Sequence, residues 1–143
     1  MFRSVLAVLA GIVVLTVASF AVEAVVNPLL LRAFPEALPG PQALAANLWV
    51  RALTFAYGLM CVAAGGYVAA RLAGRLPVQH AAAMGILQAG LTLLAMLSPV
   101  GNHASRWVWI TTATLTMPAA VAGGVACKGR KPADRVQSAA VSA

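Results

Sequence analysis

Four long stretches without a charged residue dominate this sequence. At a rise of about 1.5 Å per residue, a helix of roughly 20 residues crosses the hydrocarbon layer of a bilayer. Each stretch is close to this length, so the four predict four membrane-spanning helices. They are Ser4–Val22, Ala52–Ala70, Ala81–Ser98 and Trp107–Cys127.

The composition excludes a water-soluble globular protein. Only 9% of the 143 residues are charged and 62% are hydrophobic, whereas about 25% of an ordinary soluble domain is charged. The expected spans, at about 4–26, 48–72, 79–98 and 106–127, leave connections too short for a second domain. We expect an all-α fold, an integral membrane four-helix bundle over residues 1–130, followed by a flexible tail at 131–143.

The basic residues predict the orientation, because positively charged connections stay in the cytoplasm. One side of the expected bundle carries three basic residues, Arg32, Arg51 and Arg106. The other side, with both termini, carries seven, so we expect both termini to be cytoplasmic. The seven are Arg3, Arg71, Arg75, Lys128, Arg130, Lys131 and Arg135.

The net charge of +7 does not indicate nucleic-acid binding, because only three acidic residues offset ten basic ones. The bilayer itself is the expected partner, and anionic lipid headgroups attract basic residues close to a membrane. We expect headgroup contacts from Arg71, Arg75, Lys128, Arg130 and Lys131.

The segment Met1–Ala24 allows a second interpretation. A basic start, an apolar run and a Val-Glu-Ala ending resemble a secretory signal cleaved after Ala24. The apolar run is longer than in most such signals, and Glu23 beside the cut disfavours cleavage. Cleavage would leave three spans and an external N-terminus.

The connection Asn27–Asn47 contains four prolines, which restrict helix formation. We expect the first helix to end before Pro28 and Leu29–Phe34 to lie along the membrane surface. Because Pro41 suits a first helical position, the second helix is expected to begin there and to be the longest.

Small residues predict how the helices pack, because helices in lipid associate through close backbone approach and polar pairs. Helix-spaced stripes run along the last three spans, and we expect these faces to meet or to dock a partner. Gln88 and Thr116 lie at similar depth and are expected to form a hydrogen bond. The stripes contain Arg51, Thr54, Gly58 and Gly65, then Gly85, Gln88 and Thr92, and then Thr112, Thr116 and Gly123.

Glu23 and Arg51 are the most informative ionisable residues. Glu23 follows Arg3, and Arg51 precedes Arg71, by the length of one membrane span, so both lie at the same outer depth. We expect a structural ion pair or contact of both groups with interfacial water. The alternative is a proton or ion site, since ionisable groups at membrane depth are often functional.

Catalytic and cofactor motifs do not appear in the sequence. It has no nucleophile elbow, no HExxH, no phosphate-binding loop and no dinucleotide fingerprint. His80 and His103 fall on opposite sides of the expected membrane. We therefore expect no enzyme activity, no cofactor and no metal site.

Four segments carry a resemblance to a known kind of protein. They are GGYVAARLAGRLP at Gly65–Pro77, VLAVLAGIVVLTV at Val5–Val17, RWVWITT at Arg106–Thr112 and PAAVAGGV at Pro118–Val125. With them the chain resembles a widespread group of small, uncharacterised bacterial inner-membrane proteins with four helices. The resemblance implies a multi-pass protein of the bacterial inner membrane and transfers no activity.

Two functions remain after these exclusions. The first is a non-catalytic accessory or structural subunit that packs against other membrane-protein subunits, because small-residue faces suit helix docking. The alternative is a small proton- or ion-coupled transporter that uses Glu23. A water-filled cavity that reaches Glu23 would favour the transporter, and a dry bundle would favour the subunit.

Overall fold

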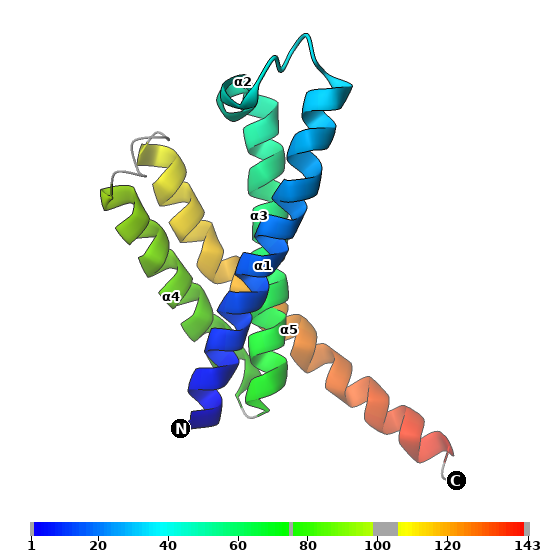
Figure 1. Cartoon of the computed structure of the whole chain (residues 1–143). Helices are drawn as coiled ribbons and strands as arrows, with labels where there is room; N and C mark the ends of the chain where they lie inside the picture. Colours follow the sequence, from blue (N-terminus) through cyan, green and yellow to red (C-terminus); the bar gives the residue numbers. More distant parts are fainter. Residues whose placement is uncertain (1, 75, 99–105, 142–143) are drawn as a thin grey trace.

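The structure is a computed structural model that describes residues 2–74, 76–98 and 106–141, with side chains for 4–44, 46–74, 76–98 and 106–128 (Figure 1). All regular elements in these ranges are helices, which confirms the expected all-α class. They are α1 (Phe2–Ala33), α2 (Pro41–Ala46), α3 (Leu48–Ala73), α4 (Pro77–Leu97) and α5 (Arg106–Val141).

Four of the described helices are long and apolar enough to cross a membrane, as the sequence predicts. The candidate segments are Ser4–Ala33, Leu48–Ala73, Pro77–Leu97 and Arg106–Lys128. Successive long helices run in opposite directions, so α2 lies at one end of the bundle and the start of α1 at the other (Figure 1). These ends are called the α2 end and the N-terminal end below.

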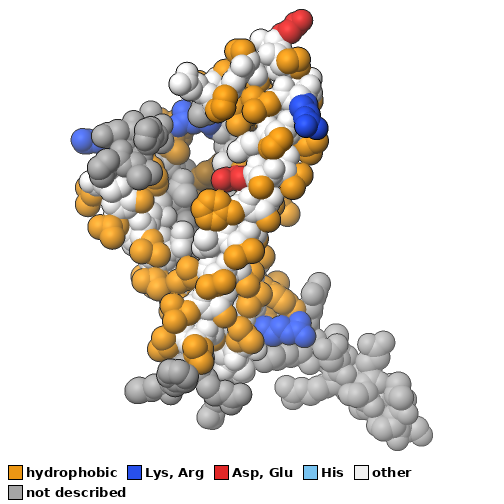
Figure 2. All heavy atoms as spheres, viewed as in Figure 1, with side chains coloured by type: hydrophobic (Ala, Val, Ile, Leu, Met, Phe, Trp, Pro, Cys, Tyr) orange, Lys and Arg blue, Asp and Glu red, His pale blue; other side chains and the backbone are white. Residues whose placement is uncertain are grey.

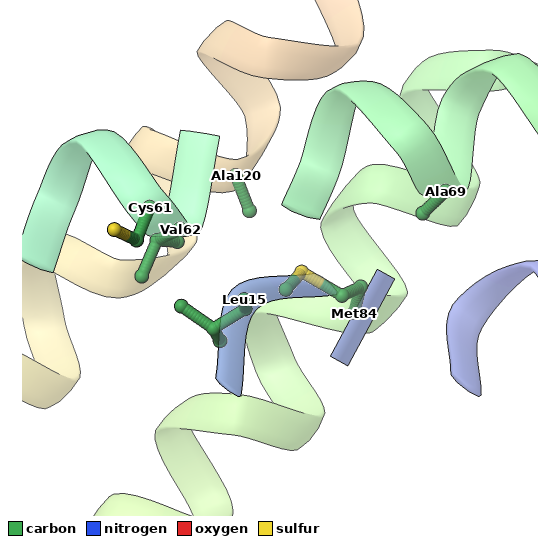
Figure 3. Close-up of a cluster of buried hydrophobic side chains, with 6 residues drawn as sticks. All are labelled: Leu15, Cys61, Val62, Ala69, Met84 and Ala120. Atoms are coloured by element: carbon green, nitrogen blue, oxygen red, sulfur yellow. The ribbon is translucent and has the colours of Figure 1, made fainter. Parts of the chain in front are cut away.

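α3 is the central helix and packs against α1, α4 and α5. The main core lies toward the N-terminal end, where Met84 of α4 is fully buried and reaches the α1–α3 contact (Figure 3). Because the core side chains are mostly small, the helices can approach closely there. The core consists of Leu15, Cys61, Val62, Ala69, Met84 and Ala120.

Glycines bring the helices of this half together. A Cβ atom on Gly11 or on Gly65 would lie 2.7–2.8 Å from the carbonyl oxygen of the other glycine. The same holds for α3 against α5, where a Cβ on Gly66 would collide with the carbonyl of Ala120 and one on Gly123 with that of Ala63. Only residues without a side chain allow these backbone contacts.

The end of α1 differs from the expectation. α1 continues through Pro28 to Ala33, so Leu29–Ala33 belong to the long helix and do not form a separate segment. Proline has a helix-compatible φ and removes only its own hydrogen bond to the carbonyl four residues earlier, a loss that membrane helices tolerate.

A small second core holds the connection after α1 against the helices. Leu38 is 1% exposed and packs with Leu44 and Val50, and Leu30 and Leu31 of α1 cover this cluster. In addition, the rings of Phe34 and Trp49 meet edge to face at 5.7 Å. The proline-rich segment therefore folds back onto the ends of α1 and α3.

The second spanning helix begins at Leu48, at the start of the expected span 48–72, and not at Pro41. Pro41 does occupy the first turn of a helix, but that helix is the separate six-residue α2. Asn47 then ends α2 and caps α3, with its side chain accepting a hydrogen bond from the Trp49 backbone N–H at 3.2 Å.

The longest helix is α5, with 36 residues, and not the second spanning helix as expected. Its helical backbone continues through the expected tail to Val141, while the flexibility of that tail stays a prediction.

Candidate functional site

The helices separate toward the α2 end and leave a cavity between them. α1 and α3 diverge there from α4 and the first half of α5 (Figure 1). The cavity has a volume of about 540 Å³ and is lined by residues of all five helices. Figure 2 shows a hollow between the surface over α1 and the surface over α4. This volume falls within the usual range of small-molecule sites.

Side-chain size explains the divergence. The close glycine contacts all belong to the N-terminal half, whereas a Cβ added to Gly58, nearer the α2 end of α3, would have nothing within 4 Å. Beyond that position α3 presents Phe55 and Tyr57 toward the cavity. Larger side chains prevent the backbone approach that the glycines allow, and the helices spread apart.

One wall of the cavity comes from α1 and α3. On α1, polar residues recur every four positions and therefore share one helical face. From Leu15 at the bottom to Asn27 near the top, this wall extends over about 18 Å. Its polar residues are Ser19, Glu23 and Asn27 on α1 and Arg51, Thr54 and Tyr57 on α3.

The opposite wall comes from α4 and α5 and is polar but uncharged. Two of its hydroxyl-bearing residues are buried, since Thr92 is only 9% exposed and Thr116 only 1%. Its hydroxyls donate to carbonyls of their own helices, from Thr92 to Gln88 at 2.9 Å and from Thr116 to Thr112 at 2.7 Å. The wall consists of Gln88, Thr92, Thr112 and Thr116, with Val108 at its edge.

Glu23 and Arg51 both line this cavity. The expected ion pair is absent, however: among the described residues no salt bridge within 4.0 Å joins Glu23 to Arg51. Both side chains remain partly exposed. Each therefore offers its charge to the cavity.

The expected hydrogen bond between Gln88 and Thr116 is also absent from the described side chains. The Thr116 hydroxyl donates to the carbonyl of Thr112 instead. Both residues line the same cavity. A threonine in a helix can satisfy its hydroxyl on the preceding turn, so it does not require a partner on another helix.

One polar atom at this site has no partner. The hydroxyl oxygen of Tyr57 is buried and makes no hydrogen bond within the described part of the chain. Tyr57 also lines the cavity. A buried hydroxyl without a partner is costly, and a bound polar molecule near it could supply the missing hydrogen bond.

The four glycines expected at helix contacts have two different environments. Gly65, Gly85 and Gly123 lie against neighbouring helices, with Gly85 facing Met117 and Ala120 of α5. Gly58 lines the cavity, because the two helical pairs have already separated at its level. Gly11 and Gly66 make equally close contacts that the expected stripes do not include.

The basic residues expected to contact lipid headgroups cluster by sequence at the N-terminal end. Arg71 lies in the last turn of α3, where its guanidinium donates to the Tyr67 hydroxyl at 3.3 Å. Lys128 of α5 is exposed. Arg75 lies outside the described residues, as do the side chains of Arg130 and Lys131.

The cavity contains polar groups of several kinds that can bind a ligand. Its polar residues are a carboxylate, a guanidinium, amides and hydroxyls. Cys61 and Cys127 are free and buried. Among the described residues, no group of three or more His, Cys, Asp or Glu side chains is placed to hold a metal ion.

A change along each stripe of the sequence is the signal that indicates the polar wall. Among the stripe residues named above, glycine lies toward the N-terminal end and threonine, glutamine or arginine toward the α2 end. Tyr57 lies outside these stripes and gives no such signal.

Searches of protein-family models, curated proteins and solved structures found no match to the chain.

Proposed function

We propose that this protein is a small membrane transporter, coupled to protons or other ions through Glu23, whose binding site is the cavity at the α2 end. The observation that carries the proposal is a cavity of about 540 Å³ that reaches this carboxylate. A dry, closely packed bundle would have no such space. Ionisable residues at membrane depth that face a cavity commonly mark ion or substrate pathways.

The orientation belongs to the same proposal. The distribution of seven basic residues against three supports cytoplasmic termini, and the resemblance to bacterial inner-membrane proteins supports that membrane. The α2 end and the mouth of the cavity then face outward. The glycine contacts close the cytoplasmic half, as in one state of a protein that opens alternately to the two sides.

α5 contains a suitable position for a change between such states. Thr116 lines the cavity and Ala120 packs against α3 and α4, and Pro118 lies between them in the sequence. Proline removes the backbone hydrogen bond to the Thr114 carbonyl, which weakens the helix at this point. The freed Thr114 carbonyl receives no hydrogen bond from the threonine hydroxyls of α5. Each of these hydroxyls donates instead to the carbonyl four residues before it; the donors are Thr111, Thr112, Thr114 and Thr116.

The test is charge movement in proteoliposomes adsorbed on a solid support. Steps in external pH, and separately in sodium concentration, should produce transient currents with the unmodified protein. Glu23→Gln should abolish them, because an amide binds neither a proton nor a cation as a carboxylate does. Glu36→Gln is the matched control, because Glu36 is exposed in the connection after α1 and does not line the cavity. Currents equal to those of empty liposomes would contradict the proposal, as would currents that survive Glu23→Gln.

An accessory subunit is the second candidate, supported by an uncovered apolar row on α1. Val13, Val17 and Phe20 are 59%, 62% and 68% exposed and lie on one helical face. Another subunit could cover this row, and so could lipid. Gentle solubilisation of native membranes should then yield a second membrane protein in fixed stoichiometry, lost with Phe20→Ala. Recovery of this chain alone would count against a subunit.

A further inference from the structure

Glu23 and Arg51 place opposite charges in one cavity without neutralising each other. Both line the space at the α2 end, and no salt bridge within 4.0 Å involves either of them in the described part of the chain. Of the lining residues, these are the two that carry a formal charge. The cavity as a whole is therefore electrically neutral but strongly dipolar.

A substrate with a single charge would use only one of these two side chains. A cation could pair with Glu23 but would leave Arg51 unpaired in a partly dehydrated space, and an anion would have the converse problem. An unpaired charge away from bulk water is unfavourable. A molecule with one ammonium and one phosphate or carboxylate satisfies both side chains at once. Arginine presents a fork of N–H donors that matches either anion.

The remaining lining agrees with a ligand of this kind. The buried hydroxyl of Tyr57 has no hydrogen-bond partner among the described residues, and Gln88 and Asn27 add amide groups around the same space. These neutral donors and acceptors can hold ester or hydroxyl oxygens without changing the charge balance.

The opening of the cavity indicates a source for such a molecule. Figure 2 shows the hollow on the side of the molecule, with an acidic side chain and hydrophobic side chains at its rim on the α1 side. The helices on either side are both long and apolar enough to span a membrane, so this side would face lipid. A lipid headgroup could then enter sideways while its chains stay in the bilayer.

We propose that the cavity binds a zwitterionic headgroup, with its ammonium at Glu23 and its phosphate at Arg51. The inference rests on the proposed function in taking this cavity as the substrate site. It adds the substrate class, which is an ammonium-bearing phosphodiester such as the headgroup of phosphatidylethanolamine.

The first experiment compares ligands on the unmodified full-length protein in detergent by native mass spectrometry. Dihexanoyl-phosphatidylethanolamine should bind at least about tenfold more tightly than dihexanoyl-phosphatidylglycerol, which has the phosphate but no ammonium. Equal binding of the two lipids would overturn the proposal. Glycerophosphoethanolamine, the same headgroup without chains, distinguishes the sources. Binding as tight as that of the lipid identifies a free solute, and much weaker binding identifies a membrane lipid.

The second experiment assigns the charges. Glu23→Gln and Arg51→Gln should each weaken phosphatidylethanolamine binding at least about tenfold, because each removes one of the two charge contacts. Arg32→Gln and Glu36→Gln are matched controls, since both residues are exposed near the same end and neither lines the cavity. Loss of binding in the controls, or retention in both cavity variants, would contradict the assignment. If a cavity variant does not fold, the ligand comparison on the unmodified protein still decides.

Failure of this inference can be distinguished from failure of the proposed function. Binding of the headgroup without any Glu23-dependent current would leave a lipid-binding protein and reject the transporter. Conversely, Glu23-dependent currents without preference for the ammonium-bearing lipid would retain the transporter and reject this substrate class.

Discussion

Single glycines determine how closely the helices of this bundle approach. A Cβ on Gly66 would collide with the backbone carbonyl of Ala120, and a backbone atom cannot rotate away as a side chain can. We therefore expect Gly66→Ala to lower the free energy of unfolding by about 1–3 kcal/mol, the usual cost of overpacking. Thermal unfolding of the purified protein in detergent measures this change.

Gly58→Ala is the matched control on the same helix. A Cβ at this position has open space within 4 Å, and alanine favours a helix by up to about 1 kcal/mol over glycine. The control should therefore be neutral or stabilising. If both variants lost stability equally, helix contact at Gly66 could not be the cause.

The sequence predicts which residues share a helical face, but not what that face meets. Spacing places Glu23 and Arg51 at one depth, and both do line one cavity. Their expected ion pair does not form, because a shared depth does not bring the ends of two side chains within 4.0 Å of each other. Sequence spacing contains no information about that separation.

At the scale of elements, packing at the ends of helices overrides local rules. Proline chemistry predicts that α1 ends before Pro28, yet the helix continues to Ala33. Leu30 and Leu31 beyond the proline pack against the cluster around Leu38, so tertiary contacts favour another helical turn. Local preference is weak compared with such packing, and only the fold of the whole connection reveals these contacts.

The same cluster leads to a prediction for the segment after α1. Leu38 is 1% exposed, and Leu38→Ala would leave a space among Leu30, Leu31, Leu44 and Val50. We expect a loss of about 2–5 kcal/mol in local stability. Proteolysis should then cut the segment between α1 and α2 much faster in Leu38→Ala.

Leu48→Ala serves as the control for this measurement. Leu48 begins α3 nearby but is 75% exposed, so its truncation should change stability by less than about 0.5 kcal/mol. Unchanged proteolysis of Leu38→Ala would show that the small core does not hold the segment.

For the whole molecule, the sequence predicts the number and placement of the spanning helices far better than their arrangement. A span requires only a long apolar run, which local composition reveals. The separation of α1 and α3 from α4 and α5 depends instead on the sum of contacts between helices. This separation results from glycine contacts at one end of the bundle and from bulky residues, such as Phe55 and Tyr57, at the other. The cavity is therefore a property of the assembled bundle.

A transport cavity must hold water, and cysteine labelling tests whether this one does. In a protein with Cys61→Ala and Cys127→Ala, Thr54→Cys places a thiol in the cavity, because Thr54 lines it. Leu53→Cys is the matched control at nearly the same depth. Leu53 is 41% exposed and does not line the cavity, so a thiol at this position would face lipid.

A thiol reacts with maleimide as the thiolate, which requires water. We therefore expect a membrane-impermeant maleimide, added outside intact cells, to label Thr54→Cys at least about tenfold faster than Leu53→Cys. Equally slow labelling of both positions would mean a dry cavity and contradict transport. Labelling of Thr54→Cys only in inverted vesicles would instead place the α2 end in the cytoplasm and reverse the proposed orientation.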